Sequence, residues 1–210
     1  MSDSELFEQV AEEIYRQGYS VLSNALPAEL CNSLAEEVRR LPSERFSRAG
    51  IGRQETHLKA EVIRRDEICW IDNSTTAGHD WLEWAGGLKQ AINRRLFLGL
   101  FSFESHYAHY QTGDFYKVHL DAFRGQQNRV LTVVTYLNPD WNPEDGGELV
   151  IYPEKGSTPL MKVMPEFGTL VVFLSEEFPH EVLPAKTDRY SIAGWYRINS
   201  SDSSRIDPEA

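Results

Sequence analysis

The sequence predicts a mainly β domain with packing helices (α+β), in which a jelly-roll core follows helices in the N-terminal part. Two observations support this class. In the first 100 residues, apolar side chains recur every three or four positions, which is the period of an amphipathic helix. From about residue 101, short alternating or β-branched runs follow one another, separated by clusters of Gly, Pro, Asn and Asp. Many short strands with regular turn signals are typical of a sandwich or jelly roll.

Three helices are expected before residue 100. Ser2 and Glu5 have the spacing of a capping box at the start of the first helix. Pro27 opens a second helix, which Pro42 ends. A third helix is expected over about 79–97. The apolar stripes expected to face the core are Leu6, Phe7, Val10, Ala11, Ile14 and Tyr15 in the first helix, and Trp81, Leu82, Trp84, Leu88, Ile92 and Leu96 in the third.

Strands are expected in YSVLSNAL after Gly18 and around AEVI and EICWID. The β-rich half then carries the runs FSFESHYAHY, FYKVHL, RVLTVVTYL, ELVIYP, GTLVVFL, HEVLP and YSIAGWYRI. We expect a single domain over residues 1–198, with the helical part at 1–100 and the jelly roll at 101–198. A polar, flexible tail is expected at 199–210.

Composition excludes several classes of protein. The net charge of −11 and the lack of an evident basic patch argue against nucleic-acid binding, because phosphate contacts need Lys and Arg. No apolar run approaches the ~20 residues of a membrane span, so no membrane association is expected. The acidic N-terminus lacks the features of a signal peptide, and we expect a cytoplasmic protein. Cys31 and Cys69 lack CxxC spacing, which indicates core packing rather than a disulfide framework or a zinc site.

The strongest local signal is the sequence YKVHLD, which contains His119 and Asp121. Residues i and i+2 of a strand point to the same face, so an imidazole and a carboxylate would lie side by side. His180 follows 59 residues after Asp121, in FPHEV. Two histidines and one carboxylate form the facial triad of non-haem iron(II) oxygenases, which leaves coordination positions open. The HxD pattern also arises by chance, so the triad by itself is a weak signal.

Arg189 strengthens the interpretation. It lies nine positions after His180 in TDRYS, on what is expected to be the next strand. The guanidinium group suits bidentate capture of a carboxylate, such as the distal carboxylate of 2-oxoglutarate. The alternative is a surface salt bridge on an antiparallel strand. Together, HxD, His and Arg in this order within a β-rich half predict an iron(II) and 2-oxoglutarate site.

The sequence resembles the prolyl hydroxylases of the 2-oxoglutarate oxygenase superfamily. The resemblance is closest to the hydroxylases that act on hypoxia-inducible factor and to their bacterial relatives. It covers roughly residues 45–197 and is carried by YKVHLD, RVLTVVTYLNPDW, GGELVIYPE and FPHEVLPAKTDRYSIAGWY. The resemblance implies a double-stranded β-helix (jelly-roll) core with packing helices, in agreement with the strand pattern.

The resemblance also implies roles for individual residues. It implies that His119, Asp121 and His180 bind iron, and that Arg189 pairs with the distal carboxylate of 2-oxoglutarate. The implied cofactor-binding residues are Arg189, Tyr136 and Tyr110, although one residue is missing between Tyr110 and Tyr116 compared with the family pattern. The implied substrate-binding residues are Tyr116, Trp195 and Arg53, the last of them in a substrate-covering loop near 45–57.

The function implied by the resemblance is 4-hydroxylation of a prolyl residue in a protein substrate. The cofactors are Fe(II), 2-oxoglutarate and O2, with L-ascorbate (vitamin C) as reductant. Bacterial relatives suggest elongation factor Tu as the target protein. Two alternatives stay open: a 2-oxoglutarate oxygenase acting on a free amino acid or another small molecule, and a non-catalytic jelly-roll binding module. The sequence does not determine the oligomeric state.

Overall fold

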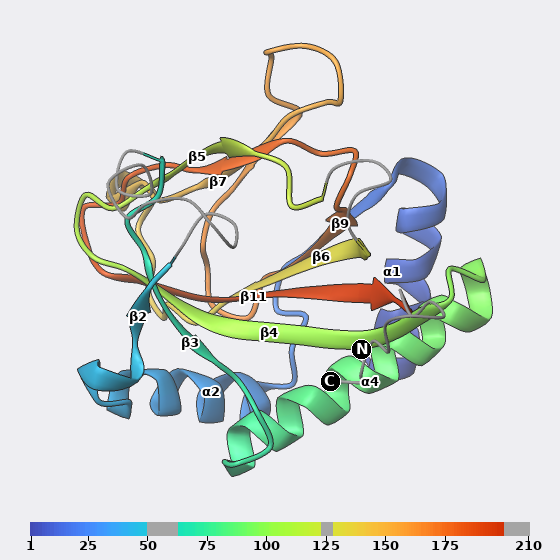
Figure 1. Ribbon diagram of the computed structural model, residues 1–210, viewed down its shortest axis with the longest axis horizontal. Coiled ribbons are helices and arrows are strands. Elements are labelled where there is room, and N and C mark those ends of the chain that lie inside the picture. The colour runs from blue at the N-terminus through green and yellow to red at the C-terminus, as the bar shows by residue number, and fades with distance from the viewer. Residues whose placement is uncertain (50–62, 123–127, 200–210) are drawn as a thin grey trace, which may run out of the picture.

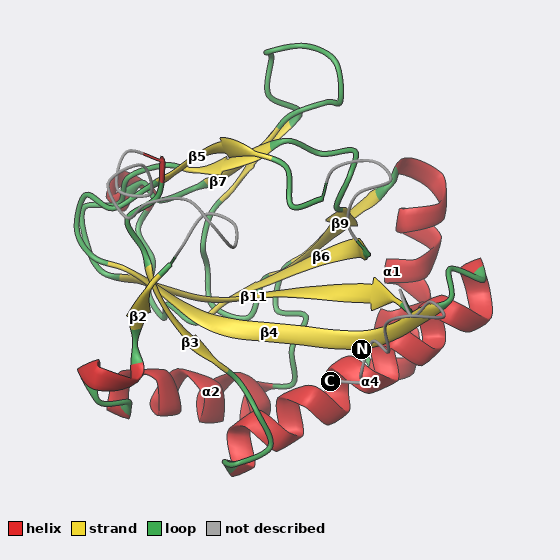
Figure 2. Ribbon diagram, in the orientation of Figure 1, coloured by secondary structure: helices red, strands yellow, loops and turns green. Residues whose placement is uncertain are grey.

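The computed structural model describes residues 1–49, 63–122 and 128–199. Two antiparallel sheets lie face to face, and helices cover the outer face of the larger sheet (Figures 1 and 2). The elements in chain order are α1 (Asp3–Gln17), β1 (Tyr19–Leu22), α2 (Ala28–Arg40), η1 (Ser43–Arg45), β2 (Ser47–Arg48), β3 (Glu67–Trp70), α4 (Thr76–Leu96), β4 (Leu100–Tyr110), β5 (Tyr116–His119), β6 (Arg129–Tyr136), η2 (Pro143–Asp145), β7 (Leu149–Ile151), β8 (Met161–Val163), β9 (Leu170–Leu174), β10 (His180–Val182) and β11 (Arg189–Ile198).

The larger sheet of the described part has the strand order β1-β9-β6-β11-β4-β3-β2, and the smaller sheet has the order β5-β10-β7-β8. From β4 to β11 the chain crosses to the other sheet at each connection except the β7–β8 hairpin, as in a jelly roll. The predicted fold class is therefore confirmed. Each expected run from residue 101 onward contains a strand, whereas β2 and β8 were not expected.

The helix boundaries follow from capping. Ser2 and Glu5 form the predicted capping box, in which the Glu5 carboxylate accepts a hydrogen bond from the Ser2 amide at 2.9 Å. Pro27 directly precedes α2, and Leu41 closes it just before Pro42. The predicted third helix is present, but it starts three residues before the expected start at about 79. The helix begins at Thr76, because the side chain of Thr75 caps it by accepting a hydrogen bond from the Gly78 amide at 3.0 Å.

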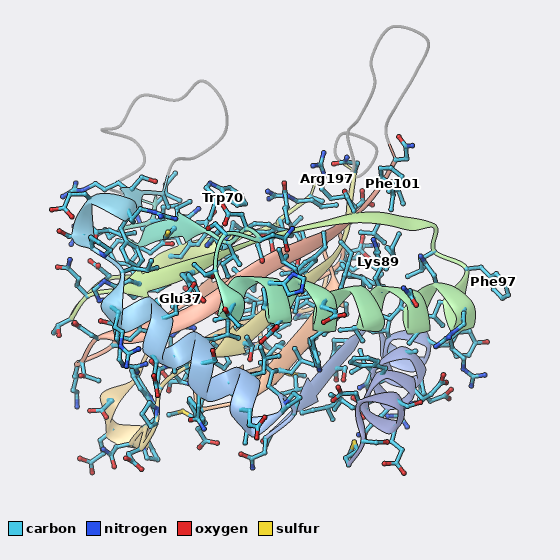
Figure 3. The ribbon with its side chains drawn as sticks, turned by 90° about the horizontal axis from the view of Figure 1, so that it is seen from below. Glu37, Trp70, Lys89, Phe97, Phe101 and Arg197 are labelled. Atoms are coloured by element: carbon cyan, nitrogen blue, oxygen red, sulfur yellow. The ribbon has the colours of Figure 1, made fainter. Side chains whose placement is uncertain are left out.

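A first buried cluster joins the helices to the larger sheet. Figure 3 shows this helical face, with α2 and α4 lying across the strands. The predicted stripes supply most of its helical side chains, including Leu6, Val10, Trp81 and Leu88. Tyr15 departs from the prediction, since its side chain is 77% exposed. It lies one position beyond Ile14, which turns it about 100° around the helix and out of the buried face.

A second buried cluster fills the space between the two sheets. It includes Tyr110, Tyr136, Phe173, Phe178 and Val182. Tyr110 and Tyr136 come from strands of the larger sheet, and Val182 comes from the smaller sheet. The candidate site residues lie in this inter-sheet layer.

Other expectations have mixed outcomes. Both cysteines are buried and free, as predicted. Most of the AEVI run, and residues 50–57 of the expected substrate loop, lie outside the described residues. Apart from Asn199, so does the expected tail, and the single domain over 1–198 stays a prediction. No helix in the described ranges combines the length and the apolar character needed to cross a bilayer.

Candidate active site

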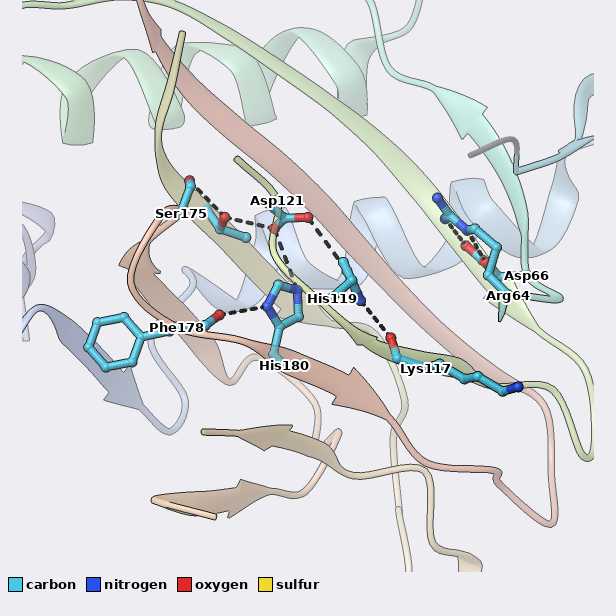
Figure 4. Close-up of polar contacts among 9 residues, drawn as sticks. Arg64, Asp66, Lys117, His119, Asp121, Ser175, Phe178 and His180 are labelled. Carbon is cyan, nitrogen blue, oxygen red and sulfur yellow. Dashed lines mark hydrogen bonds and ion pairs between the residues drawn. The ribbon is translucent and has the colours of Figure 1, made fainter. Parts of the chain in front are cut away.

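His119, Asp121 and His180 converge at one end of the inter-sheet layer (Figure 4). His119 ends β5, and His180 begins β10 directly opposite it in the antiparallel pair. One ligand atom from each of the three residues lies within 4.8 Å of the others. This spacing suits a single metal ion.

Asp121 does not continue the strand, so this part of the sequence prediction is wrong. β5 ends at His119, and the chain bends at Asp121. The carboxylate nevertheless reaches both imidazoles. Asp121 Oδ1 lies 3.6 Å from His119 Nε2, and Asp121 Oδ2 lies 3.5 Å from His180 Nε2.

The backbone selects the tautomer of each histidine. His119 Nδ1 lies 2.8 Å from the Lys117 carbonyl oxygen, and His180 Nδ1 lies 3.0 Å from the Phe178 carbonyl oxygen. A carbonyl oxygen only accepts hydrogen bonds, so each Nδ1 carries a proton, and in the neutral form of each ring the lone pair is on Nε2. Both Nε2 lone pairs are therefore available to a metal, which is the usual outer-shell arrangement of histidine ligands.

Protonation at neutral pH matches the forms that bind metals. Burial lowers the pKa of His180 to about 4, so its imidazole is neutral. Burial opposes ionisation of Asp121, but His180, His119 and hydrogen bonding outweigh it and hold the pKa of the carboxyl below its ordinary value. The cluster thus presents a carboxylate and a neutral buried imidazole.

Aromatic rings fix the imidazole planes. Tyr116 stacks on His119 with ring centroids 3.5 Å apart, and the Arg64 guanidinium lies 4.3 Å from the centre of the Tyr116 ring. Arg64 is held in turn by a buried ion pair with Asp66, which Figure 4 shows beside the site. Phe173 meets His180 edge-on at 4.8 Å.

Arg189 lies in the same layer, at the start of β11, and is 1% exposed. Its guanidinium carbon is 5.0 Å from the ring centres of both Tyr110 and Tyr136. Nε donates to the Gly147 carbonyl at 2.9 Å, and Nη1 donates to Ser191 Oγ at 3.2 Å. Among the residues that the structure describes, no carboxylate lies within ion-pair distance of Arg189.

This burial contradicts the alternative of a surface salt bridge. A buried cation without a counter-ion is costly, so the site around Arg189 favours an anionic ligand. The Tyr136 hydroxyl adds a second polar group, since it is buried without a hydrogen-bond partner among the described residues. Burial raises the pKa of Tyr136 to about 12 against the opposing charge of Arg189, which keeps the hydroxyl protonated and able to donate.

The other predicted residues have different outcomes. Tyr110 is buried beside Arg189, and Tyr116 packs on His119 as described above. Trp195 is 8% exposed and lies under the guanidinium of Arg129, 3.7 Å from the ring centre. Its role at a substrate entrance stays a prediction. Arg53 lies outside the described residues.

Sequence reasoning missed two hydroxyls beside the triad. Thr132 Oγ1 donates to Asp121 Oδ2 at 2.8 Å and lies 2.9 Å from Ser175 Oγ. Thr132, Val134 and Tyr136 are two residues apart along β6 and therefore share one face of the strand. The two-residue period could thus have placed Thr132 on the face of the site. Ser175 follows β9 and has no local signal of this kind.

The donor set fits ferrous iron. Two imidazoles and one carboxylate on one side of a metal match the facial arrangement that non-haem iron(II) oxygenases use, with positions left for a co-substrate. The buried guanidinium of Arg189, which has no carboxylate partner in the described part of the chain, matches a co-substrate that carries a second carboxylate.

Comparison with known proteins agrees with this geometry. A sequence model of the 2OG-Fe(II) oxygenase superfamily matches residues 105–197. The crystal structure of a Pseudomonas putida prolyl-4-hydroxylase is 41% identical, with a TM-score of 0.83, and the match covers 92% of this chain and 100% of that one. The chain belongs to the 2OG-Fe(II) oxygenase superfamily.

Two further relatives are a prolyl hydroxylase of known structure and an Egl nine homolog. A Trichoplax adhaerens prolyl hydroxylase, solved in complex with a hypoxia-inducible factor oxygen degradation domain peptide fragment, is 29% identical with a TM-score of 0.79. That match covers 93% of this chain and 90% of the other. Mouse Egl nine homolog 1 is 30% identical over 202 residues, which cover 90% of this chain and 49% of the mouse protein. The chain spans between 28% and 49% of the first curated relatives that it matches.

Proposed function

We propose that this chain is an Fe(II)- and 2-oxoglutarate-dependent dioxygenase that hydroxylates a prolyl residue of a protein at the 4-position. The observation that carries the proposal is the pairing of two features in one buried layer. One is a His-Asp-His cluster with its Nε2 atoms free, and the other is a buried arginine without a carboxylate partner among the described residues. Few ligands other than a metal and a dicarboxylate satisfy both.

Each residue has a defined part in this proposal. His119, Asp121 and His180 hold the iron, with the histidine tautomers fixed by the Lys117 and Phe178 carbonyls. Arg189 binds the distal carboxylate of 2-oxoglutarate, and the protonated Tyr136 hydroxyl donates a second hydrogen bond to it. Tyr110 forms the wall on the other side of the guanidinium.

Bound iron and 2-oxoglutarate supply oxidising power, since the co-substrate and O2 yield succinate and carbon dioxide while one oxygen atom enters the substrate C–H bond. The protein contributes geometry and the exclusion of water. In the inter-sheet cluster, Phe173 meets His180 edge-on and Phe178 packs against Phe173, which places apolar side chains beside the histidine. L-Ascorbate is the proposed reductant.

The similarity to prolyl hydroxylases supports a protein substrate with a target proline, and elongation factor Tu is the candidate that we name. Tyr116 and Trp195 are proposed to line the entrance for the proline. A free amino acid or another small molecule is the alternative substrate. The buried and complete site argues against a non-catalytic module.

The test is succinate release from 2-oxoglutarate with added Fe(II), with and without elongation factor Tu, proline-containing peptides and free amino acids. Mass spectrometry of the products locates any added oxygen atom. We expect turnover to rise with a protein that gains one oxygen on a proline. His119→Ala and Arg189→Ala should abolish it. The exposed His79→Ala and Arg95→Ala are matched controls and should leave it unchanged.

If only small molecules stimulate succinate release, the chain is still an oxygenase, but the proposal of a protein substrate is excluded. Absence of turnover from a protein that binds no metal would exclude the oxygenase itself.

A further inference from the structure

Two buried hydroxyls connect the larger sheet to the carboxylate of the candidate metal site. Thr132 lies on β6 and Ser175 follows β9, and these strands pair with each other. Thr132 is 1% exposed and Ser175 is fully buried. Figure 4 shows the resulting line of contacts from Ser175 to Asp121.

The direction of these hydrogen bonds follows from their chemistry. A carboxylate oxygen only accepts hydrogen bonds. Thr132 has one hydroxyl proton, which it donates to Asp121 Oδ2 at 2.8 Å. Ser175 Oγ, 2.9 Å from Thr132 Oγ1, must therefore be the donor in the second bond. The chain of donors runs from Ser175 through Thr132 to Asp121.

Asp121 has particular need of such support. His119 and His180 lie in strands, and each is oriented by a backbone carbonyl two residues earlier. Asp121 lies in a bend beyond the end of β5, where no sheet ladder fixes its side chain. A hydrogen bond that holds one carboxylate oxygen limits rotation of the group.

We propose that Thr132 and Ser175 are positioning residues that hold Asp121 as a metal ligand, an inference that rests on the proposed function. Thr132 fixes the carboxylate through Oδ2 and restrains it from rotating into a symmetric, two-oxygen contact with the metal. Ser175 sets the direction of the Thr132 hydroxyl. The larger sheet thereby determines the geometry of a ligand that belongs to neither sheet.

A purely structural role predicts something different. Buried hydroxyls need partners whether or not a metal binds, so their loss would lower the stability of the metal-free protein and leave metal affinity unchanged. A positioning role predicts weaker metal binding by a protein that is still folded. Metal affinity and metal-free stability are therefore measured separately.

The experiment is titration of metal-free protein with Co(II), followed by visible absorption, for wild type, Thr132→Val, Thr132→Ser and Ser175→Ala. Outer-shell substitutions weaken metal binding by roughly 10- to 100-fold, and we expect a loss of this size for Thr132→Val. Thr132→Ser keeps the donor and should bind within about threefold of wild type. Ser175→Ala should lose less than Thr132→Val, because Thr132 can still donate. Melting curves of the metal-free proteins check that each variant is folded.

Two further variants, Asp121→Ala alone and Asp121→Ala with Thr132→Val, separate the direct effect from an indirect one. In an Asp121→Ala background, adding Thr132→Val should change Co(II) affinity by less than about twofold, because the group that Thr132 positions is gone. A Thr132→Val protein that is folded and binds Co(II) as wild type would overturn the inference alone, as would an equal loss in both backgrounds. Wild-type protein that binds no Co(II) would overturn both this inference and the proposed function.

Discussion

The two ends of the candidate site are fixed by different parts of the backbone. Arg189 begins β11, a ten-residue strand paired with β4 on one side and β6 on the other, and Tyr110 and Tyr136 lie on those neighbours. We call these three residues the arginine end. The metal end comprises His119, Asp121 and His180, on strands of four and three residues and on the bend after β5.

The difference shows how each end keeps its geometry. Backbone ladders on both sides of β11 hold the arginine end, so the sheet itself is its support. At the metal end, β5 is an edge strand of the described smaller sheet, and the β5–β10 register shifts between His180 and Val182. β10 pairs with β5 and β7, whereas Asp121 lies outside the strands, and individual hydrogen bonds to Lys117, Phe178 and Thr132 orient the three side chains.

The largest expected effect, that of Arg189→Ala, tests whether the arginine end and the metal end bind their ligands independently. Arg189→Ala removes the buried partner of the proposed distal carboxylate, and 2-oxoglutarate affinity should fall at least about 100-fold, or roughly 3 kcal/mol. Co(II) affinity should stay within about threefold of wild type. Calorimetric titration of 2-oxoglutarate into Co(II)-loaded protein measures the first quantity, and Arg95→Ala is the control. Equal losses in both affinities would show that the two ends are one unit.

Gly194→Ala should damage the support of the arginine end. An added Cβ would lie 2.7 Å from Phe103 Cζ and 2.8 Å from Ser105 Cβ, in the middle of β11. Such overpacking costs about 1–3 kcal/mol, measured by urea unfolding. The change should weaken 2-oxoglutarate binding more than metal binding. The control is Gly86→Ala in α4, where open space surrounds the new Cβ and a gain of up to about 1 kcal/mol is expected.

The pH dependence of stability tests a buried group of the larger sheet in the absence of metal and 2-oxoglutarate. Burial, helped by Arg64, lowers the pKa of His106 on β4 to about 4, whereas the unfolded chain has a pKa near 6.5. The unfolded state therefore binds an extra proton between these values, and stability falls as the pH drops from about 6.5 to 4. His106 accounts for about 2 kcal/mol of loss by pH 5. Urea unfolding of metal-free His106→Gln at pH 7.5 and 5 should show a decline smaller by that amount. An unchanged decline would assign the pH dependence to other groups, such as His180.

The smallest effect concerns one hydroxyl at the arginine end. Tyr136→Phe removes a buried oxygen that has no hydrogen-bond partner among the described residues, so stability should not fall. Affinity for 2-oxoglutarate should drop about fivefold, or roughly 1 kcal/mol, by calorimetric titration. Tyr196→Phe is the matched control, for which we expect a loss of stability and no loss of 2-oxoglutarate affinity. Its hydroxyl donates to the Ala85 carbonyl at 2.7 Å, so stability should fall and affinity should not.

The candidate site residues could be predicted because their side-chain types and their order along the chain indicate metal and carboxylate binding. HxD, a later His and a later Arg identify candidates at any distance along the chain, and the geometry brings the three ligands together. The reasoning for Asp121 was nevertheless wrong in part, since the strand ends before it. Thr132 was within reach of the two-residue period of β6, whereas Ser175 was not, because its contact spans 43 positions of sequence.

The sequence by itself determined the class of fold, the cap of the first helix and the candidate ligand set, because hydrophobic period, capping residues and side-chain chemistry are local properties. Tertiary structure decided which strands share a sheet, that Arg189 is buried without a described carboxylate partner, and how Asp121 is held. These features depend on contacts between segments far apart in the chain. Their energies come from pairing and burial that exist only once the two sheets have closed on each other.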